Sequence, residues 1–300
     1  MLSLHQAKFK AMGSPCKLQI YTTSPDLFDS LVQDIRAEIL RLEIKYTRFN
    51  EDSQTSKINK AAGTDNPVPI DSETFQLLQY ADTLHEQSNG LFDITSGVLR
   101  QAWDFKSQTL PSPSTLDALL PIIGWQHVSW DQFAIRLPKQ GMQIDFGGYV
   151  KEYAADVVST RCLDQGISHG LINLGGDIRV IGPHPDNTPW KIGIQHPRKA
   201  GGIATLELDH GAIATSGDYE RFMMVQGKRY CHLLNPYTGR PIDPKYASIT
   251  VAAECCLLAG SFSSIGMLKS PEDPDWLADT GVAYLTIQQD MALGGSLNPG

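Results

Sequence analysis

The sequence has few cysteines and no long apolar run. Its five cysteines form neither a Cys-x-x-Cys pair nor a spacing typical of zinc sites, which argues against a metal-thiolate centre. No stretch approaches the roughly 20 apolar residues that a membrane-spanning helix needs. The first residues, MLSLHQAKFKAMGS, lack the apolar core and cleavage site of a secretory signal. We therefore expect reduced thiols, no membrane span and a cytoplasmic location.

The sequence also lacks an excess of positive charge. Lys and Arg total 25 against 33 Asp and Glu, and no run of more than two consecutive basic residues occurs. A nucleic-acid-binding surface would need a basic patch, so we expect no nucleic-acid partner. There is no low-complexity tract, linker or fixed-period repeat, which favours a single globular domain over residues 1–300.

The spacing of the apolar residues changes along the chain. Residues 17–23 alternate and predict a strand, whereas apolar residues at a period of 3.6 predict a helix from Pro25 to about residue 45, capped by Ser24. A second helix is expected from Ser72. Residues 47–70 favour turns, and the proline-containing stretch 104–124 favours a loop with a short helix.

The second half of the chain is dominated by short β-type runs separated by Gly, Pro, Asn or Asp. They occupy residues 170–174, 178–182, 190–195, 203–208, 212–217, 220–225 and 247–253. A helix over 257–268 and a strand over 282–287 follow. Because helices and strands do not alternate regularly, the pattern indicates an α+β fold with mostly antiparallel sheets.

One stretch places an acid and two glycines between a strand and a helix. It reads IDFGGYVKEYAAD (144–156), with Asp145 followed by Gly147 and Gly148. Glycines allow a phosphate to approach the backbone at a helix N-terminus, and the acid could hold a nucleotide or a metal. Alternatively, Asp145 only caps the helix.

Four further stretches also have two interpretations. SNGLFDITSG (88–97) offers the ring of Phe92 and the carboxylate of Asp93 to a ligand, or a helix cap. NLGGD (173–177) and ATSGDYERF (214–222) suit either a phosphate or ribose site or tight turns. YCHLLNPYTGRP (230–241) places His232 in a strand-like run before an Asn-Pro turn, where it is either a general base or a structural histidine.

Taken in order, these stretches resemble the motifs of the ApbE-type FAD:protein FMN transferase family. FKAMGSP (9–15) and TRFNEDSQTSKIN (47–59) are similar to two further family motifs, so the resemblance runs over about residues 8–290. It implies an ApbE-like (T-fold-type) α+β fold of mixed antiparallel sheets with packed helices. It also implies an enzyme that cleaves FAD, attaches FMN through its phosphate to a Thr or Ser of an acceptor protein, and releases AMP with Mg²⁺ as cofactor.

The resemblance also assigns site residues. The expected FAD contacts are Met12, Leu91, Phe92, Asp93, Asp145, Lys151 and Leu234. The backbone carbonyl of Gly148 and the hydroxyl of Ser264 are the expected metal ligands. His232 is the expected base for the acceptor hydroxyl.

One family feature is missing. The family's metal site includes an aspartate four residues before a threonine on one helix face, and the corresponding residues here are Gly260 and Ser264. Glycine cannot replace a carboxylate, so a flavin-binding protein with lost or weakened transfer is one alternative. A magnesium-dependent FAD pyrophosphatase, which would need no acceptor protein, is another. Gly260→Asp is expected to raise magnesium affinity. Tyr149 and Glu152 replace small residues of the motif helix, which is expected to narrow the pocket or to move Lys151.

Overall fold

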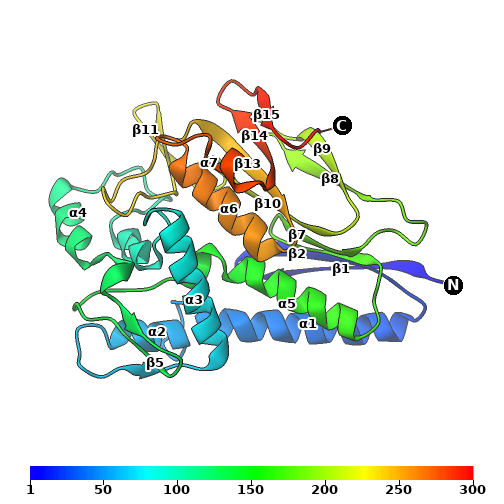
Figure 1. The fold of residues 1–300 in the computed structure, drawn as a ribbon, viewed down its shortest axis with the longest axis horizontal. Helices are drawn as coiled ribbons and strands as arrows, with labels where there is room; N and C mark the ends of the chain where they lie inside the picture. The colour runs from blue at the N-terminus through cyan, green and yellow to red at the C-terminus, as the bar shows by residue number, and fades with distance from the viewer. Residues whose placement is uncertain (300) are drawn as a thin grey trace.

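The computed structural model describes residues 1–299, and its largest element is an eight-stranded antiparallel sheet (Figure 1). In spatial order its strands are β1 (Ser3–Ala11), β2 (Ser14–Thr22), β6 (Gly170–Leu174), β7 (Asp177–Gly182), β10 (Gly211–Gly217), β13 (Tyr246–Ala253), β14 (Ala283–Gln288) and β15 (Leu293–Gly295). Every neighbouring pair is antiparallel. The α+β class is therefore confirmed.

Three long helices cover one face of this sheet. They are α1 (Pro25–Tyr46), α5 (Val150–Asp164) and α6 (Cys256–Lys269), with α1 and α5 side by side (Figure 1). The α1 helix begins as predicted, because Ser24 Oγ accepts a hydrogen bond from the Leu27 amide at 3.3 Å. Its apolar residues at helical spacing are buried with those of α5, α6 and the sheet in the main core.

A β-hairpin covers the opposite face. Strands β8 (Trp190–Gln195) and β9 (Gly202–Leu208) pair only with each other among the described residues. Their inward side chains, such as Ile192 and Leu206, pack with Val180 and Ile213 from the sheet in a second core. The sheet is thus buried on both faces, by helices on one side and by a hairpin on the other.

The remaining elements form a group beside the sheet (Figure 1). They are α2 (Gln54–Lys60), α3 (Ser72–Gln87), α4 (Pro113–Leu119), the 3₁₀ turns η1 (Ile94–Gln101), η2 (Leu120–Ile122), η3 (Trp125–His127) and η4 (Phe146–Gly148), and the small sheet of β3 (Val68–Pro69), β5 (Ala134–Arg136) and β4 (Ser129–Trp130). The hairpin of β11 (Phe222–Val225) and β12 (Lys228–Cys231) and the short α7 (Trp276–Thr280) complete the chain. The Tyr80 hydroxyl of α3 donates to the Leu257 carbonyl at 3.1 Å, which ties this group to α6.

Some local predictions were wrong. The stretch 47–70 contains the helix α2, capped by Ser53, whose two turns are too short to show a helical period. Strand β1 was not predicted at all. His232 directly follows β12 and does not lie within a strand. No helix within residues 1–299 combines the length and the apolarity needed to cross a bilayer, and all five cysteines are free thiols.

Candidate functional site

The turn before α5 is capped by Asp145 and surrounded by cations. Asp145 Oδ1 accepts a hydrogen bond from the Gly147 amide at 2.8 Å, as the capping interpretation predicts. Its Oδ2 lies 3.7 Å from both Arg48 Nη1 and Arg100 Nε. Two guanidinium groups therefore face the start of α5, so the turn combines a helix N-terminus with the positive charge that a phosphate requires.

Phe92 lies against this turn. A Cβ atom added to Gly148 would be 3.1 Å from Phe92 Cζ, so glycine permits the close approach of backbone and ring. Leu91 lines a cavity of about 160 Å³ with Asn235 and Leu268. The segment 91–92 and the Gly148 turn are thus neighbours, as their joint assignment to one site requires.

Asp93 has a structural role in the same segment. Its Oδ1 accepts from the Thr95 amide at 2.7 Å, and its Oδ2 accepts from the Trp125 amide at 2.9 Å. The carboxylate is buried and caps η1. These bonds fit the capping interpretation, and an FAD contact of Asp93 stays a prediction.

Two glycine-containing turns meet beside α5. Met12, in the turn between β1 and β2, has φ = 49° and donates its amide to Glu43 Oε2 at 2.9 Å. In the turn between β6 and β7, a Cβ atom added to Gly175 would lie 2.6 Å from Ser14 Cβ and 3.7 Å from Lys151 Nζ. The NLGGD stretch is therefore a tight turn, and it places Lys151 close to the Met12 turn.

Lys151 belongs to a buried charge cluster with two acids. Its ammonium group pairs with the Asp177 carboxylate of β7 and lies 4.0 Å from Glu152 Oε1. Burial lowers the pKa of Lys151, but the two acids together raise it above its ordinary value. Burial and the neighbouring Asp177 raise the pKa of Glu152 to about 8. Two carboxyl groups thus share one cation in a poorly solvated place.

Glu152 fills the space beside Gly260 of α6. A Cβ atom on residue 260 would lie 2.5 Å from Glu152 Cγ and 3.1 Å from its Cδ and Oε1. The Glu152 side chain of α5 thus occupies the space that a side chain at position 260 would take. Tyr149, by contrast, is fully buried in the main core and donates to the Leu77 carbonyl at 2.9 Å, so it does not narrow a pocket.

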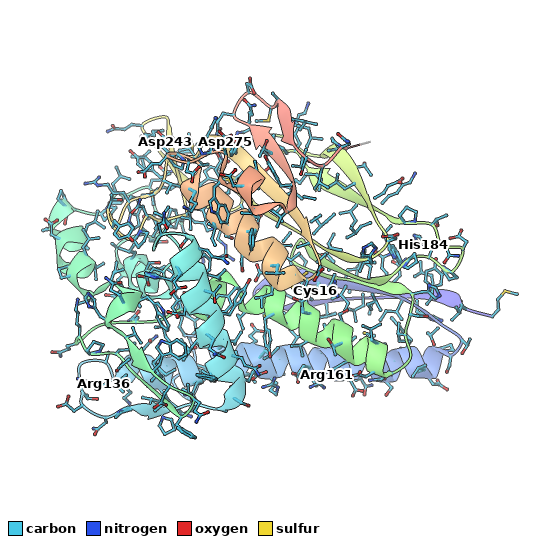
Figure 2. The ribbon with its side chains drawn as sticks, viewed as in Figure 1. Cys16, Arg136, Arg161, His184, Asp243 and Asp275 are labelled. Atoms are coloured by element: carbon cyan, nitrogen blue, oxygen red, sulfur yellow. The ribbon has the colours of Figure 1, made fainter. Side chains whose placement is uncertain are left out.

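Ser264 follows one turn later on α6. Its hydroxyl lies 2.9 Å from Ser216 Oγ of β10, which is also 2.9 Å from Ser263 Oγ. The ATSG stretch of β10 therefore meets the α6 face that follows Gly260. Figure 2 labels Cys16 of β2 near the place where α5 and α6 approach each other over the sheet. Within residues 1–299, no three His, Cys, Asp or Glu side chains are grouped as metal ligands.

His232 has a defined tautomer. Its Nδ1 lies 3.1 Å from the Arg221 carbonyl, which can only accept, so Nδ1 carries the hydrogen and Nε2 keeps its lone pair. Burial, followed by Arg221 and Arg100, lowers the pKa of His232 to about 4. Arg100, whose charge acts on His232, also lies 3.7 Å from Asp145 before α5. Leu234 pairs with Pro241 and packs on the cluster around Val98.

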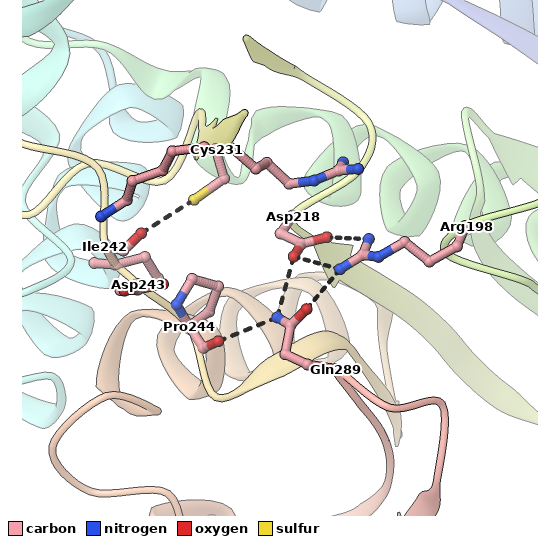
Figure 3. A pocket seen from close by; sticks show the side chains of 9 residues that line it. Arg198, Asp218, Cys231, Ile242, Asp243, Pro244 and Gln289 are labelled. Atoms are coloured by element: carbon pink, nitrogen blue, oxygen red, sulfur yellow. Dashed lines mark hydrogen bonds and ion pairs between the residues drawn. The ribbon is translucent and has the colours of Figure 1, made fainter. Parts of the chain in front are cut away.

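A second cavity, of about 360 Å³, lies beside the β11–β12 hairpin (Figure 3). Asp218, from the ATSGDYERF stretch, accepts two bonds from Arg198 at 2.6 and 2.7 Å and one from Gln289 at 3.2 Å. Asp218 is therefore a structural residue that joins three segments. Of the predicted FAD contacts, the described linings of both cavities contain Leu91 alone.

Four charged neighbours were not assigned from the sequence. Arg48 lies in the TRFN stretch and Asp177 ends NLGGD, so both had a motif as a signal. Glu152 directly follows Lys151, but its relation to Gly260 has no local signal. Arg100 had none, because it is an ordinary basic residue near the end of η1.

Comparisons with known proteins show the family and the fold of this chain. A sequence model described as the ApbE family matches residues 12–286. An FAD:protein FMN transferase of Chlamydia pneumoniae is 34% identical over 79% of this chain and 76% of its own, and one of Klebsiella pneumoniae is 32% identical over 80% and 74%. The crystal structure of the ApbE protein from Thermotoga maritima superposes with a TM-score of 0.89 at 30% identity, covering 98% of this chain and 97% of its own. The flavin transferase ApbE from Vibrio cholerae, at 24% identity, gives 0.87 over 100% and 98%, which bears on the fold.

Proposed function

The chain belongs to the ApbE family, and on that premise we propose that it is an FAD:protein FMN transferase. The observation that carries the proposal is the cationic turn at the start of α5. It occurs in a chain whose similar proteins are named FAD:protein FMN transferase. Arg48 and Arg100 flank Asp145 there, and Lys151 follows on the first turn of the helix. An FAD pyrophosphate bound at this turn would meet helix amides and positive charge together.

The proposed reaction is a phosphoryl-group displacement. The oxygen of an acceptor Thr or Ser attacks the phosphorus of the FMN half of FAD, and the bond from that phosphorus to the bridging oxygen breaks. AMP leaves with the bridging oxygen, and the acceptor oxygen becomes esterified to FMN. Lys151 and the two arginines would stabilise charge on the phosphoryl oxygens, which is the main task of a protein in this chemistry.

His232 is proposed to take the proton of the acceptor hydroxyl. Its Nδ1–H is directed to the Arg221 carbonyl, so Nε2 is the basic atom. The low pKa keeps the ring neutral at pH 7 and therefore able to accept a proton. The positive charge of Arg100 disfavours a protonated His232 ring. The ring would therefore release the proton to solvent readily once transfer is complete.

Magnesium is the cofactor that the family resemblance implies, and residues of this chain suit it. Glu152 has a buried oxygen, Oε2, without a hydrogen-bond partner, and Ser264 presents a hydroxyl on the adjacent helix. Together with the Gly148 carbonyl they would offer the hard oxygen ligands that Mg²⁺ prefers. When bound, the ion would supply charge neutralisation at the phosphates.

The test is AMP release from FAD by the purified protein. We expect release that requires both Mg²⁺ and a threonine-bearing acceptor protein, with covalent flavin fluorescence on the acceptor after denaturing electrophoresis. A threonine-to-alanine acceptor is the matched control and should stay unlabelled. Transfer to the native acceptor would be about 100-fold or more slower without the His232 base.

Either of two other results would overturn the proposal. Release of FMN and AMP at the same rate without an acceptor would make the protein an FAD pyrophosphatase. Tight FAD binding without AMP release under any condition would make it a flavin-binding member of the family. The absence of an aspartate at position 260 favours the second result, but the neighbouring Glu152 provides a carboxylate at that point.

A further inference from the structure

Residues 152 and 260 compete for one space between α5 and α6. The point where a residue-260 side chain would begin lies 2.5 Å from Glu152 Cγ, which is closer than two unbonded carbons can approach. Any side chain at position 260 of α6 would thus require the Glu152 side chain to move. The two positions form a complementary pair, with the large acidic residue on α5 and the glycine on α6.

The Glu152 carboxyl group is incompletely paired for a buried acid. The residue is 8% exposed, and its Oε2 has no hydrogen-bond partner. Its Oε1 lies 4.0 Å from Lys151 Nζ, which is already engaged by Asp177. A buried polar oxygen without a hydrogen-bond partner is costly, and a bound cation is one way to satisfy it.

The surroundings of this carboxyl group also suit a cation. Glu152 and Asp177 bring two carboxyl groups to one lysine, so their oxygens share a single cationic partner. One turn beyond Gly260, the Ser264 hydroxyl lies on α6 and contacts Ser216 Oγ at 2.9 Å. Glu254, the other acid near the start of α6, is exposed and is no substitute.

We propose that Glu152 supplies the carboxylate ligand of the divalent cation in this protein, from α5 in place of α6. The inference rests on the proposed function, because that function requires the cation. It changes the expectation drawn from the sequence in two ways. The metal site is relocated and intact, and Gly260→Asp alone does not improve it, since the new side chain meets Glu152.

The experiment measures Mn²⁺ binding by electron paramagnetic resonance of the free ion, in the presence of FAD and without acceptor. Glu152→Gln keeps the shape of the side chain and removes its charge. We expect at least a ~10-fold loss of Mn²⁺ affinity in this variant, because a carboxylate is a major ligand at such sites. Gly260→Asp alone is expected to bind no better than the unaltered protein.

The decisive variant exchanges the two positions. Glu152→Gly with Gly260→Asp removes the side chain that blocks residue 260 and restores a carboxylate from α6. Its Mn²⁺ affinity should recover to within a few-fold of the unaltered protein. Glu38→Gln is the matched control, because Glu38 is also a buried glutamate but pairs with Arg41 and Arg161 away from this cluster. It should leave Mn²⁺ affinity unchanged.

The outcomes separate this inference from the proposed function. Unchanged Mn²⁺ affinity in Glu152→Gln would overturn the inference, even if the protein transfers FMN. A selective loss in that variant, with recovery in the exchange variant, would support it even if the acceptor assay shows no transfer. Thermal unfolding of each variant without metal identifies any loss that arises from misfolding.

Discussion

At the scale of single residues, His232 is unusual because its surroundings keep the ring neutral at pH values well below the ordinary histidine pKa. Burial and two arginines lower its pKa to about 4. A general base must be unprotonated, so its activity is retained at neutral pH and lost only as pH falls through about 4. We expect the acidic limb of the kcat/KM profile for FMN transfer near pH 4, and not near the ordinary histidine value of about 6.5.

Replacement of His232 tests the same assignment independently of pH. We expect His232→Asn to lower the rate of FMN transfer by about 100-fold or more while FAD affinity stays within a few-fold, because a base acts on the acceptor proton. His127→Asn, at an exposed histidine in η3, is the control. A His232→Asn enzyme with an unaltered rate, or an acidic limb near pH 6.5, would remove His232 from the mechanism.

At the scale of elements, the relation between α5 and α6 is fixed by a cap that crosses from one helix to the other. The N-cap residue of α6, Cys255, provides no side-chain hydrogen bond. Instead, Asp156 of α5 accepts from the Cys256 amide at 2.9 Å and from the Leu257 amide at 2.8 Å. Two of the four free amides at the start of α6 are satisfied in this way. These two hydrogen bonds fix the position of α6 along α5, and thereby the position of Gly260 opposite Glu152.

Removal of this cap should be costly. We expect Asp156→Ala to lower the free energy of unfolding by about 1–2 kcal/mol, the usual loss for a helix cap, with urea denaturation as the measurement. Asp156→Asn keeps one acceptor oxygen and should lose less. Asp29→Ala, at an exposed position of α1, is the control. Equal stability of the alanine variant and the unaltered protein would mean that α6 begins without help from α5.

At the scale of the whole molecule, the sequence predicts those helices, caps and turns that depend on residues close together in the chain. The period of α1 and its Ser24 cap were visible because one helix face is buried over its length. Strand β1 was missed because it is an edge strand with largely exposed residues, and α2 because it has only two turns. The turn at Asp145 was found from its own residues. The complementarity of Glu152 and Gly260 could not be predicted, since it arises only when α5 packs on α6.

The position of the candidate site also predicts how ligands affect the stability of the whole chain. Residues of α5, α6, β7 and β10 meet there, and these elements share the main core, so binding should resist global unfolding and not only local opening. A ligand at 100 times its dissociation constant adds about 2.7 kcal/mol to the free energy of unfolding, which corresponds to a rise of roughly 5 °C in Tm for a chain of this size.

We expect FAD with Mg²⁺ to raise Tm by that order in calorimetry, and FAD alone to raise it less. Because Glu152→Gln removes the proposed metal ligand, its Tm with FAD should rise less on addition of Mg²⁺ than that of the unaltered protein. An equal rise with and without Mg²⁺ in the unaltered protein would contradict a metal that binds together with FAD.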